Sequence, residues 1–351
     1  FKVFRYHNRF TPIASLLQQK FLFFTEMTKN LARFVRVFRP QIIHAHNALS
    51  IPSVARVAEM HHVLGIAHVR DHRFECFTSR LRCLSHHDAT LLEFARCVDN
   101  PFYMLAFPYA KLITGFIRSA LVKCGKAFAV SNYLRQELLR TMTIDVRVSY
   151  SGVDLEEIKR IRPATEINRR FYEPATTIVY AGGLEKFKGI FELLDGFRLV
   201  LKKMSHISLL IAGDGPYRKA VQKFIEVNRM KENVVLLGAL PHEPTISAIK
   251  ASGMVIVPSL LPEGGSRVIM EALACGKPVL ASNRGANPEM VGDAGITFSC
   301  TPKDIAQTIL RLLRDKQKIE EMSHLARRRS LAFSLETTRN RIVKAYEDWL
   351  R

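Results

Sequence analysis

Two glutamates, Glu263 and Glu271, lie eight positions apart on either side of a Gly-Gly-Ser turn and could bind the hydroxyls of a ligand. The apolar run 254–257 before them predicts a buried strand, and the residues after Gly265 predict a helix. A glycine turn between a strand and a helix directs free backbone N–H groups, and the positive end of the helix dipole, at an anion. A site that offers N–H groups to phosphate and carboxylates to hydroxyls suits a nucleotide-sugar.

The same stretch is also compatible with an ordinary connection between a strand and a helix. In the functional interpretation, Glu263 lies in the loop at the mouth of the helix, and Glu271 reaches a neutral hydroxyl about two turns further on. In the structural interpretation, Glu271 is a solvated helix residue. Such connections are common in α/β proteins, so these residues alone leave both interpretations open.

A second glycine turn is followed by a cation. Gly182 and Gly183 come directly after the predicted strand 177–181, and Lys188 follows in the same loop. Glycines allow a ligand to approach the backbone closely, and a lysine supplies a point charge for phosphate. Gly-Gly turns are frequent, so this motif alone is a weak indication of a phosphate site.

Polar residues also follow two predicted strands of the N-terminal half, His44 and His46 in one and Arg70 and Asp71 in the other. Ligands of parallel sheets bind outside the carboxyl ends of the strands, so these residues are candidates for a site. His44 and His46 project from one face of a strand and could hold a metal ion. No third ligand lies in clear register, so we interpret the pair as structural or acceptor-contacting and expect no metal centre.

Strands that alternate with helices would position all these residues. This alternation predicts an α/β fold with parallel sheets. We expect strands within 41–47, 66–72, 126–132, 146–150, 177–181, 207–212, 234–237, 254–257 and 278–282. We expect helices at 16–38, 54–64, from 133, after 189, and at 217–228, 241–252, 302–314 and 335–351. The Ser-Gly-Val-Asp sequence at 151–154 marks the domain boundary, and a charged linker follows over 155–174.

The composition is that of a globular protein, with 351 residues, 48% hydrophobic and 24% charged. Fifty-two Lys and Arg against thirty-two Asp and Glu give a net charge of +20, which favours anionic partners. Nothing matches a nucleic-acid-binding module, and no apolar run approaches the ~20 residues that cross a bilayer. The six cysteines form no disulfide framework, so we expect free thiols in a reducing, cytoplasmic compartment.

Two amphipathic stretches could contact a membrane surface. Residues 16–38 combine aromatic with basic side chains, and residues 111–123 are moderately apolar. Either stretch could lie on an anionic membrane. For 16–38 we favour packing of the aromatic face on a sheet.

Two features of the sequence carry less weight. The spacing of Cys76, Cys83, His86 and His87 is too irregular for us to assign a zinc site. The chain lacks an initiator Met and begins inside a strand-like run, so we expect its true N-terminus to be missing.

Taken in order, the motifs resemble those of the retaining glycosyltransferases of family four, the group-one glycosyltransferases of the GT-B fold. The resemblance runs from about Ser151 to Phe298, and more loosely through 42–46 and 129–132. The motifs are Ser-Gly-Val-Asp, Gly-Gly-Leu with Lys-Gly, Ala-Gly-Asp-Gly-Pro, Leu-Gly, Pro-Ser, Glu-x7-Glu, Ala-Cys-Gly-Lys-Pro-Val and Gly with Asn-Pro-Glu. The resemblance implies two Rossmann-like domains facing a cleft. Residues 1–152 would form the acceptor-side domain, incomplete at its start, 153–330 the donor domain, and 331–351 a helix crossing back.

The resemblance also implies roles for residues at matching positions. Glu271 would accept hydrogen bonds from ribose hydroxyls, Glu263 would lie against the donor sugar, and Lys188 would neutralise the diphosphate leaving group. Neither a metal nor another cofactor is required. The remaining donor-binding residues would be Gly183, Gly213, Gly238, Gly265, Ser266, Arg267 and Val268.

Two positions depart from the family pattern. The family usually has an arginine, paired with the lysine on the diphosphate, where this chain has Gly183. Losing a charge-assisted contact to developing phosphate charge weakens transition-state stabilisation. The family often has a histidine where this chain has Arg70, which could still contact the phosphate or the sugar of the donor. We expect the catalytic residues to be Glu263, Lys188 and Arg70. His46 and Asp71 would lie on the acceptor side.

We therefore expect a retaining glycosyltransferase that moves a hexose-type sugar from a nucleotide-diphosphate sugar to a hydroxyl of a glycan or lipid-linked acceptor. The alternative that Gly183 leaves open is a non-catalytic nucleotide-sugar-binding or scaffold subunit of a glycosyltransferase complex. From the positive charge we also expect peripheral contact with the inner face of an anionic membrane. We expect no specific nucleic-acid partner. No residue pattern distinguishes a UDP-sugar from a GDP-sugar.

Overall fold

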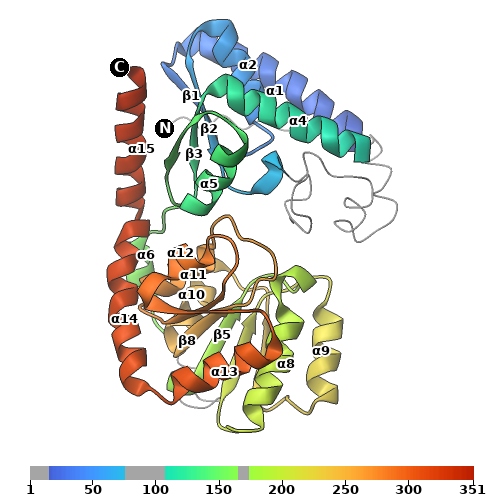
Figure 1. Cartoon of the computed structure of the whole chain (residues 1–351), viewed down its shortest axis with the longest axis vertical. Helices are drawn as coiled ribbons and strands as arrows, with labels where there is room; N and C mark the ends of the chain where they lie inside the picture. The colour runs from blue at the N-terminus through green and yellow to red at the C-terminus, as the bar shows by residue number, and fades with distance from the viewer. Residues whose placement is uncertain (1–15, 76–106, 165–173) are drawn as a thin grey trace. The chain divides into compact units, whose positions relative to one another are not determined.

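A computed structural model describes residues 16–75, 107–164 and 174–351 of the chain (Figure 1). The contacts divide the chain into two compact units. The first contains mainly residues 1–128 and 138–147, and the second contains mainly 129–137 and 148–349.

The N-terminal sheet has four strands in the order β1-β2-β3-β4, and β1 pairs with β2 in parallel. The strands are β1 (Ile42–Ala45), β2 (Leu64–Val69), β3 (Lys126–Ala129) and β4 (Asp145–Val148). The helices of this half are α1 (Leu16–Phe38), α2 (Ile51–His61), α4 (Phe107–Cys124) and α5 (Asn132–Thr141). All four strands lie within the stretches expected to contain them or overlap them by most of their length.

Helix α1 confirms the helix expected at 16–38, but its packing differs from the expectation. The main contact of its described residues is with helix α2, and the hydroxyl of Ser53 on α2 donates to the carbonyl of Phe24 at 3.3 Å. The Phe24 ring meets Phe116 of α4 edge-on at 5.3 Å between centroids. The helix ends where Arg39, at φ 45, precedes Pro40, since a residue before proline is disfavoured in the α region.

The second sheet has six strands in the order β10-β9-β8-β5-β6-β7, and every pairing in it is parallel. The chain runs outward from β5 to β7 and then returns to the other side of β5 with β8, so the strand order reverses between β5 and β8. In an open parallel sheet, ligands bind at such a reversal, outside the carboxyl ends of the strands. The strands are β5 (Thr177–Ala181), β6 (Ser208–Ala212), β7 (Val234–Gly238), β8 (Met254–Val257), β9 (Val279–Ser282) and β10 (Gly295–Phe298).

The two faces of this sheet bury two separate cores. On β5, Ile178 and Tyr180 belong to one core and Val179 to the other, as the alternation of a strand requires. One face is covered by α8 (Ile190–Leu201), α9 (Arg218–Val227) and α13 (Pro302–Leu313), whose buried residues share the first core. Helices α10 (His242–Ala251), α11 (Arg267–Ala274) and α12 (Asn287–Val291) contribute to the second core on the other face.

Four features of this half differ from the sequence expectations. Helix α6 (Leu155–Arg160) occupies the start of the expected linker, because Asp154 accepts hydrogen bonds from the backbone N–H groups of its first turn. Helix α12 replaces an expected loop, with proline in its first turn. Strand β10 and helix α14 (Lys316–Ser330) were not expected. The last helix, α15 (Leu335–Leu350), confirms its prediction.

Arg327, Arg328 and Arg329 lie in the last turn of helix α14. The guanidinium of Arg329 donates to the carbonyls of Glu289 and Met290, at the end of α12. Among the described residues, no helix is long and apolar enough to cross a membrane. The described cysteines Cys124, Cys275 and Cys300 are free thiols. The expected first strand and the cysteines and histidines at 76–87 lie outside the described residues.

Candidate functional site

Two loops leave the sheet at the strand reversal and carry the residues of opposite charge that the sequence singled out. The loop after β5 ends in a short 3₁₀ turn, Lys186–Lys188, and the loop after β8 carries Glu263. The backbone N–H of Leu260 donates to the carbonyl of Phe187 at 2.9 Å, which ties the two loops together. The Nζ of Lys188 then lies 2.6 Å from Oε1 of Glu263, with both side chains half-buried or more.

The Glu263 carboxylate has a second donor and its backbone is held independently. The hydroxyl of Ser259, which is buried, donates to Oε1 of Glu263 at 2.5 Å. The N–H of Ala286, from the loop after β9, donates to the carbonyl of Glu263 at 2.8 Å. A side chain at Gly285, where φ is +57, would meet the Glu263 backbone within 2.5 Å. Three strand exits therefore fix the position of Glu263.

Glu271 lies just over one turn into helix α11, not two, because the helix begins at Arg267 with Ser266 as its N-cap. Its Oε1 lies 3.1 Å from Nε2 of His242, at the start of α10, and 3.8 Å from Nε of Arg267. The Nδ1 of His242 in turn lies 3.6 Å from Glu157. Burial raises the pKa of Glu271 above its ordinary value of 4.5, although the neighbouring His242 and Arg267 oppose the shift.

The glycine turns after β5, β6 and β7 pack against one another. The N–H of Gly213 donates to the carbonyl of Gly238 at 2.7 Å, and a side chain at Gly213 would lie 1.8 Å from the carbonyl of Gly182. Gly213 is therefore required by the close approach of two backbones. The hydroxyl of Tyr180 donates to the carbonyl of Gly183 at 2.7 Å, which fixes that turn.

Gly183 itself is not required by packing. A Cβ at this position would have no neighbour closer than 3.8 Å, and its φ lies outside the left-handed region. The loop therefore has room for the beginning of a side chain where the family usually carries arginine.

The turn that leads into α11 is tightly packed. The N–H of Ser266 donates to Sδ of Met290 at 3.1 Å, and Ser266 is buried. A Cβ at Gly265 would lie 3.3 Å from the side chain of Val130. Val268 is partly buried against the second core. Contacts of these residues with a donor stay predictions.

In the first unit, the polar exits of β1 and β2 line one cavity of about 290 Å³. His46, Arg70 and Asp71 all contribute to it, beside the apolar side chains of Ile51 and Phe74. The carboxylate of Asp71 accepts from the N–H of Arg73 at 3.0 Å and so begins a short 3₁₀ turn. The structure thus brings His46 and Asp71, which the sequence placed on the acceptor side, together with Arg70, which it assigned to the donor.

A third histidine joins the expected pair. The nitrogen ligand atoms of His44, His46 and His68 lie within 4.8 Å of one another. Burial and the two neighbouring imidazoles lower the pKa of His44 to about 3. Burial and the charge of Arg70 also lower the pKa of His46. The sequence predicted that these two strands lie in a parallel sheet, but it did not predict the register that brings His68 beside His44 and His46.

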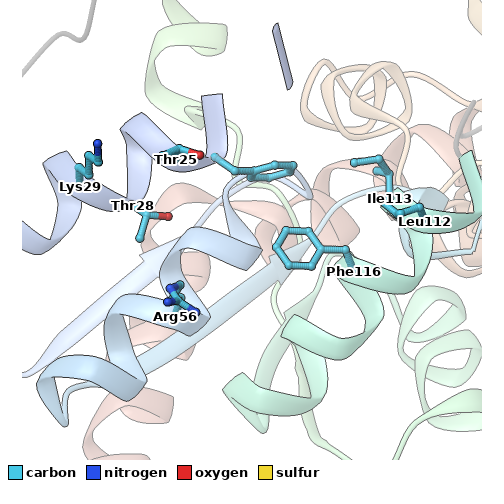
Figure 2. A pocket seen from close by; sticks show the side chains of 8 residues that line it. Thr25, Thr28, Lys29, Arg56, Leu112, Ile113 and Phe116 are labelled. Carbon is cyan, nitrogen blue, oxygen red and sulfur yellow. The ribbon is translucent and has the colours of Figure 1, made fainter. Parts of the chain in front are cut away.

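A larger hollow of about 810 Å³ lies among helices α1, α2 and α4 (Figure 2). Its walls carry the apolar side chains of Phe24, Ile113 and Phe116, and it is also lined by Lys29 of α1 and Arg56 of α2. The hollow therefore combines an apolar interior with two cationic side chains.

Sequence reasoning missed four residues that position the site: Ser259, Tyr180, His242 and His68. Ser259 stands at the end of a strand, in a Pro-Ser pair that the motif analysis included without a role. His242 lies in sequence 29 positions from Glu271, so only the fold shows their contact.

Two family models match consecutive parts of the chain. The model described as glycosyl transferases group 1 matches residues 162–329, and that of glycosyltransferase family 4 matches residues 2–157. The first contains the strand reversal with its two loops. The second contains the histidines and the cavity at the exits of β1 and β2.

Over the aligned residues, the curated relatives are between 22% and 31% identical to the chain. An α-D-kanosaminyltransferase of Streptomyces kanamyceticus is 25% identical over 70% of this chain and 62% of the relative. A lipopolysaccharide 1,2-N-acetylglucosaminetransferase of Salmonella typhimurium is 31% identical over 51% of this chain. The chain spans only 49% of the length of that second relative.

A solved structure shows the same fold. Anabaena HepE in complex with UDP superposes with a TM-score of 0.71 at 17% identity, over 92% of this chain and 82% of HepE. The same protein has been solved with UDP-glucose. Because the two family models together match residues 2–157 and 162–329, this chain belongs to the retaining family 4, or group 1, glycosyltransferases, and its fold is GT-B.

Proposed function

We propose that this chain is a retaining glycosyltransferase that takes a hexose-type sugar from a nucleotide-diphosphate sugar and transfers it to a hydroxyl of a glycan or lipid-linked acceptor. The observation that carries the proposal is the pair of carboxylates at the strand reversal, each held by a different set of partners. Glu263 contacts Lys188 and Ser259, while Glu271 contacts His242 and Arg267.

The two carboxylates suit two parts of one donor. Glu271 is a buried acceptor one turn into a helix, where ribose hydroxyls can donate to it without placing phosphate beside a negative charge. Lys188 supplies a cation in the loop after β5 for the diphosphate. Glu263, held by three strand exits, lies against the sugar. The N–H groups of Gly265, Ser266 and Arg267, at the N-terminal end of α11, are assigned to sugar hydroxyls and phosphate.

The transfer itself follows from positioning and charge. The bond between the anomeric carbon and the diphosphate oxygen breaks while the acceptor oxygen bonds to the same face of that carbon. The acceptor proton goes to the departing diphosphate. The protein holds the reactants in place and stabilises the charge that develops on the leaving group, which is the role of Lys188.

The cavity lined by His46, Arg70 and Asp71 is assigned to the acceptor side, with Arg70 also available to a phosphate or a sugar. The curated relatives differ in what their names say they transfer, so the sugar of this chain remains to be measured. HepE was solved with UDP and with UDP-glucose, which makes UDP the first nucleotide to test.

The hollow among α1, α2 and α4 supports a lipid-linked acceptor and contact with an anionic membrane surface. Its apolar walls suit acyl or isoprenoid carbon, and Lys29 and Arg56 suit the phosphate of a lipid. Exposed Leu112 and Phe116 on α4 extend the apolar surface outward.

A non-catalytic nucleotide-sugar-binding subunit is the second candidate, and Gly183 favours it. Packing leaves room for a side chain there, so the missing arginine is not imposed by the fold. The test is hydrolysis of a panel of UDP-, GDP- and ADP-sugars by the full chain, measured as release of free sugar and nucleotide. Sugar release that the Lys188→Ala variant lacks would support the transferase. Binding of a nucleotide-sugar without any release by the parent protein or by Gly183→Arg would support the binding subunit.

A further inference from the structure

Three histidines converge at the exits of β1 and β2 in the first unit. Ala45 of β1 pairs with Ala67 of β2. The residues that follow them, His46 and His68, are therefore also neighbours. His44 lies two positions before His46 and therefore points to the same face. The rings of His44 and His46 lie 4.2 Å apart between centroids, and each lies 5.4 Å from the ring of His68.

This arrangement has the composition of a transition-metal site. Imidazole nitrogen is a preferred ligand of zinc, copper and nickel, and three protein ligands leave a coordination position for water or a substrate oxygen. The three ligand atoms lie within 4.8 Å of one another, and tetrahedral ligands at about 2.0–2.1 Å from zinc lie ~3.3 Å apart. A small rotation of the His46 ring would bring the ligand atoms to this shorter separation, and His46 can make it because it is exposed at the end of its strand.

The surroundings both favour and oppose a cation. Phe128 packs against the rings of His44 and His68, at 5.5 and 5.6 Å between centroids, and so forms an apolar wall that limits their rotation. His46 opens on the cavity that Asp71 and Arg70 line. Asp71 adds a negative charge there, and Arg70 adds a positive one that opposes a bound cation.

We propose that His44, His46 and His68 bind one divalent transition-metal ion, with zinc as the probe, at the rim of the cavity lined by His46, Arg70 and Asp71. This site belongs to the first unit, whereas the carboxylates and the lysine assigned to the donor belong to the second. The open coordination position gives the cavity a Lewis-acidic point for an oxygen or nitrogen ligand.

The experiment is a zinc titration of the full chain in competition with a chromophoric chelator, together with the visible spectrum of the cobalt-loaded protein. We expect one zinc per chain at this site and the intense absorption of tetrahedral cobalt. His46→Ala and His44→Ala should each lower the affinity for zinc by roughly 100-fold or more. Even residues that only hydrogen-bond to a metal ligand contribute about 10–100-fold to the affinity. His324→Ala, an exposed histidine of α14, should leave zinc binding unchanged.

Two further variants keep the result decisive. His68 is buried, so His68→Ala is interpreted only if its melting curve shows a folded protein. Arg70→Gln should raise the affinity for zinc by about 5-fold, because it removes the opposing positive charge and leaves the three histidines unchanged. Equal zinc binding by the parent protein and His46→Ala, or weaker binding by Arg70→Gln, would overturn the proposal.

Discussion

The candidate site consists of a few ionisable side chains, and several of their partners come from other loops. Lys188 and Glu263 could be identified from residue type and spacing, because a charge after a glycine turn and a carboxylate before a helix are local patterns. The partners that hold them could not. Ser259 lies only four positions before Glu263, but its residue type does not reveal that its hydroxyl comes to 2.5 Å of the carboxylate. His242 comes to 3.1 Å of Glu271 only through the fold.

Replacing Lys188 should slow transfer more than it weakens donor binding. We expect Lys188→Ala to lower kcat by about 10²–10³-fold, because a preorganised charge contributes most where charge develops, and to raise the Kd for the donor by less than ~10-fold. Single-turnover kinetics with isothermal titration separate the two effects. Lys219→Ala, an exposed lysine of α9, is the control. Equal losses in kcat and affinity would assign Lys188 to ground-state binding.

Glu271→Gln should stabilise the ligand-free protein at neutral pH. Burial raises the pKa of Glu271 in the folded chain, so the folded chain holds this proton more tightly than the unfolded chain. The ionised carboxylate is then destabilising, fully so above its folded pKa and not at all below its unfolded pKa near 4.5. We expect the variant to melt at a higher temperature at pH 7.5, and the gain to vanish by about pH 4. A lower melting temperature at pH 7.5 would show that the charge is stabilising.

At the scale of elements, the strand reversal between β5 and β8 is the feature on which the proposed donor site rests. Strands β5 to β8 were predictable, because each is a short apolar run closed by glycine or proline. Strand β10 and helix α14 were not. Most of β10 is only partly buried, and α14 buries just Met322, Ala326 and Ser330, so neither shows the apolar periodicity that marks the others.

Two helical glycines give a matched test of helix packing. Gly196 of α8 faces α13, which runs beside it (Figure 1), and a Cβ there would lie 2.8 Å from Cγ2 of Ile305. Gly196→Ala should therefore destabilise this pair of helices by roughly 1–3 kcal/mol. Gly115 of α4 has no neighbour within 4 Å of the added carbon, so Gly115→Ala should stabilise its helix by about 0.5–1 kcal/mol.

Amide hydrogen exchange reports both effects, because it measures the local free energy of opening in each helix. Faster exchange in α8 and α13 of Gly196→Ala and slower exchange in α4 of Gly115→Ala are the expected results. Slower exchange in α8 of Gly196→Ala would show that α8 and α13 are not packed as described.

At the scale of the whole molecule, the net charge of +20 is the property most easily predicted and least specific. Composition gave its sign, and the structure adds a place where cationic and apolar side chains meet, the hollow of Figure 2. The domain boundaries expected at 152 and 330 stay predictions. These boundaries rest on the positions of motifs. The contacts assign residues 129–137 to the second unit, and no local sequence pattern could predict such long-range contacts.

The protein should float with anionic vesicles and not with neutral ones. We expect binding to fall as salt rises, since screening weakens attraction between the positive surface and anionic lipid. Reversing both charges at the hollow, with Lys29→Glu and Arg56→Glu, should abolish most of the binding. The matched control reverses two exposed charges of the second unit, with Lys219→Glu and Arg311→Glu. An equal loss of vesicle binding in the control variant would show that binding depends on the net charge and not on the hollow.

The donor assignment of Glu271 is tested most directly by isothermal titration of UDP, GDP and their sugars into the parent protein, Glu271→Gln and Glu320→Gln. Glu320 is exposed on α14 and serves as the control for loss of one carboxylate. Losing hydrogen bonds to a charged acceptor costs about 1.5–3 kcal/mol, so we predict a 10–150-fold rise in Kd for Glu271→Gln with one nucleotide, while the control matches the parent. A folded Glu271→Gln variant that binds every nucleotide-sugar as tightly as the parent would contradict the account.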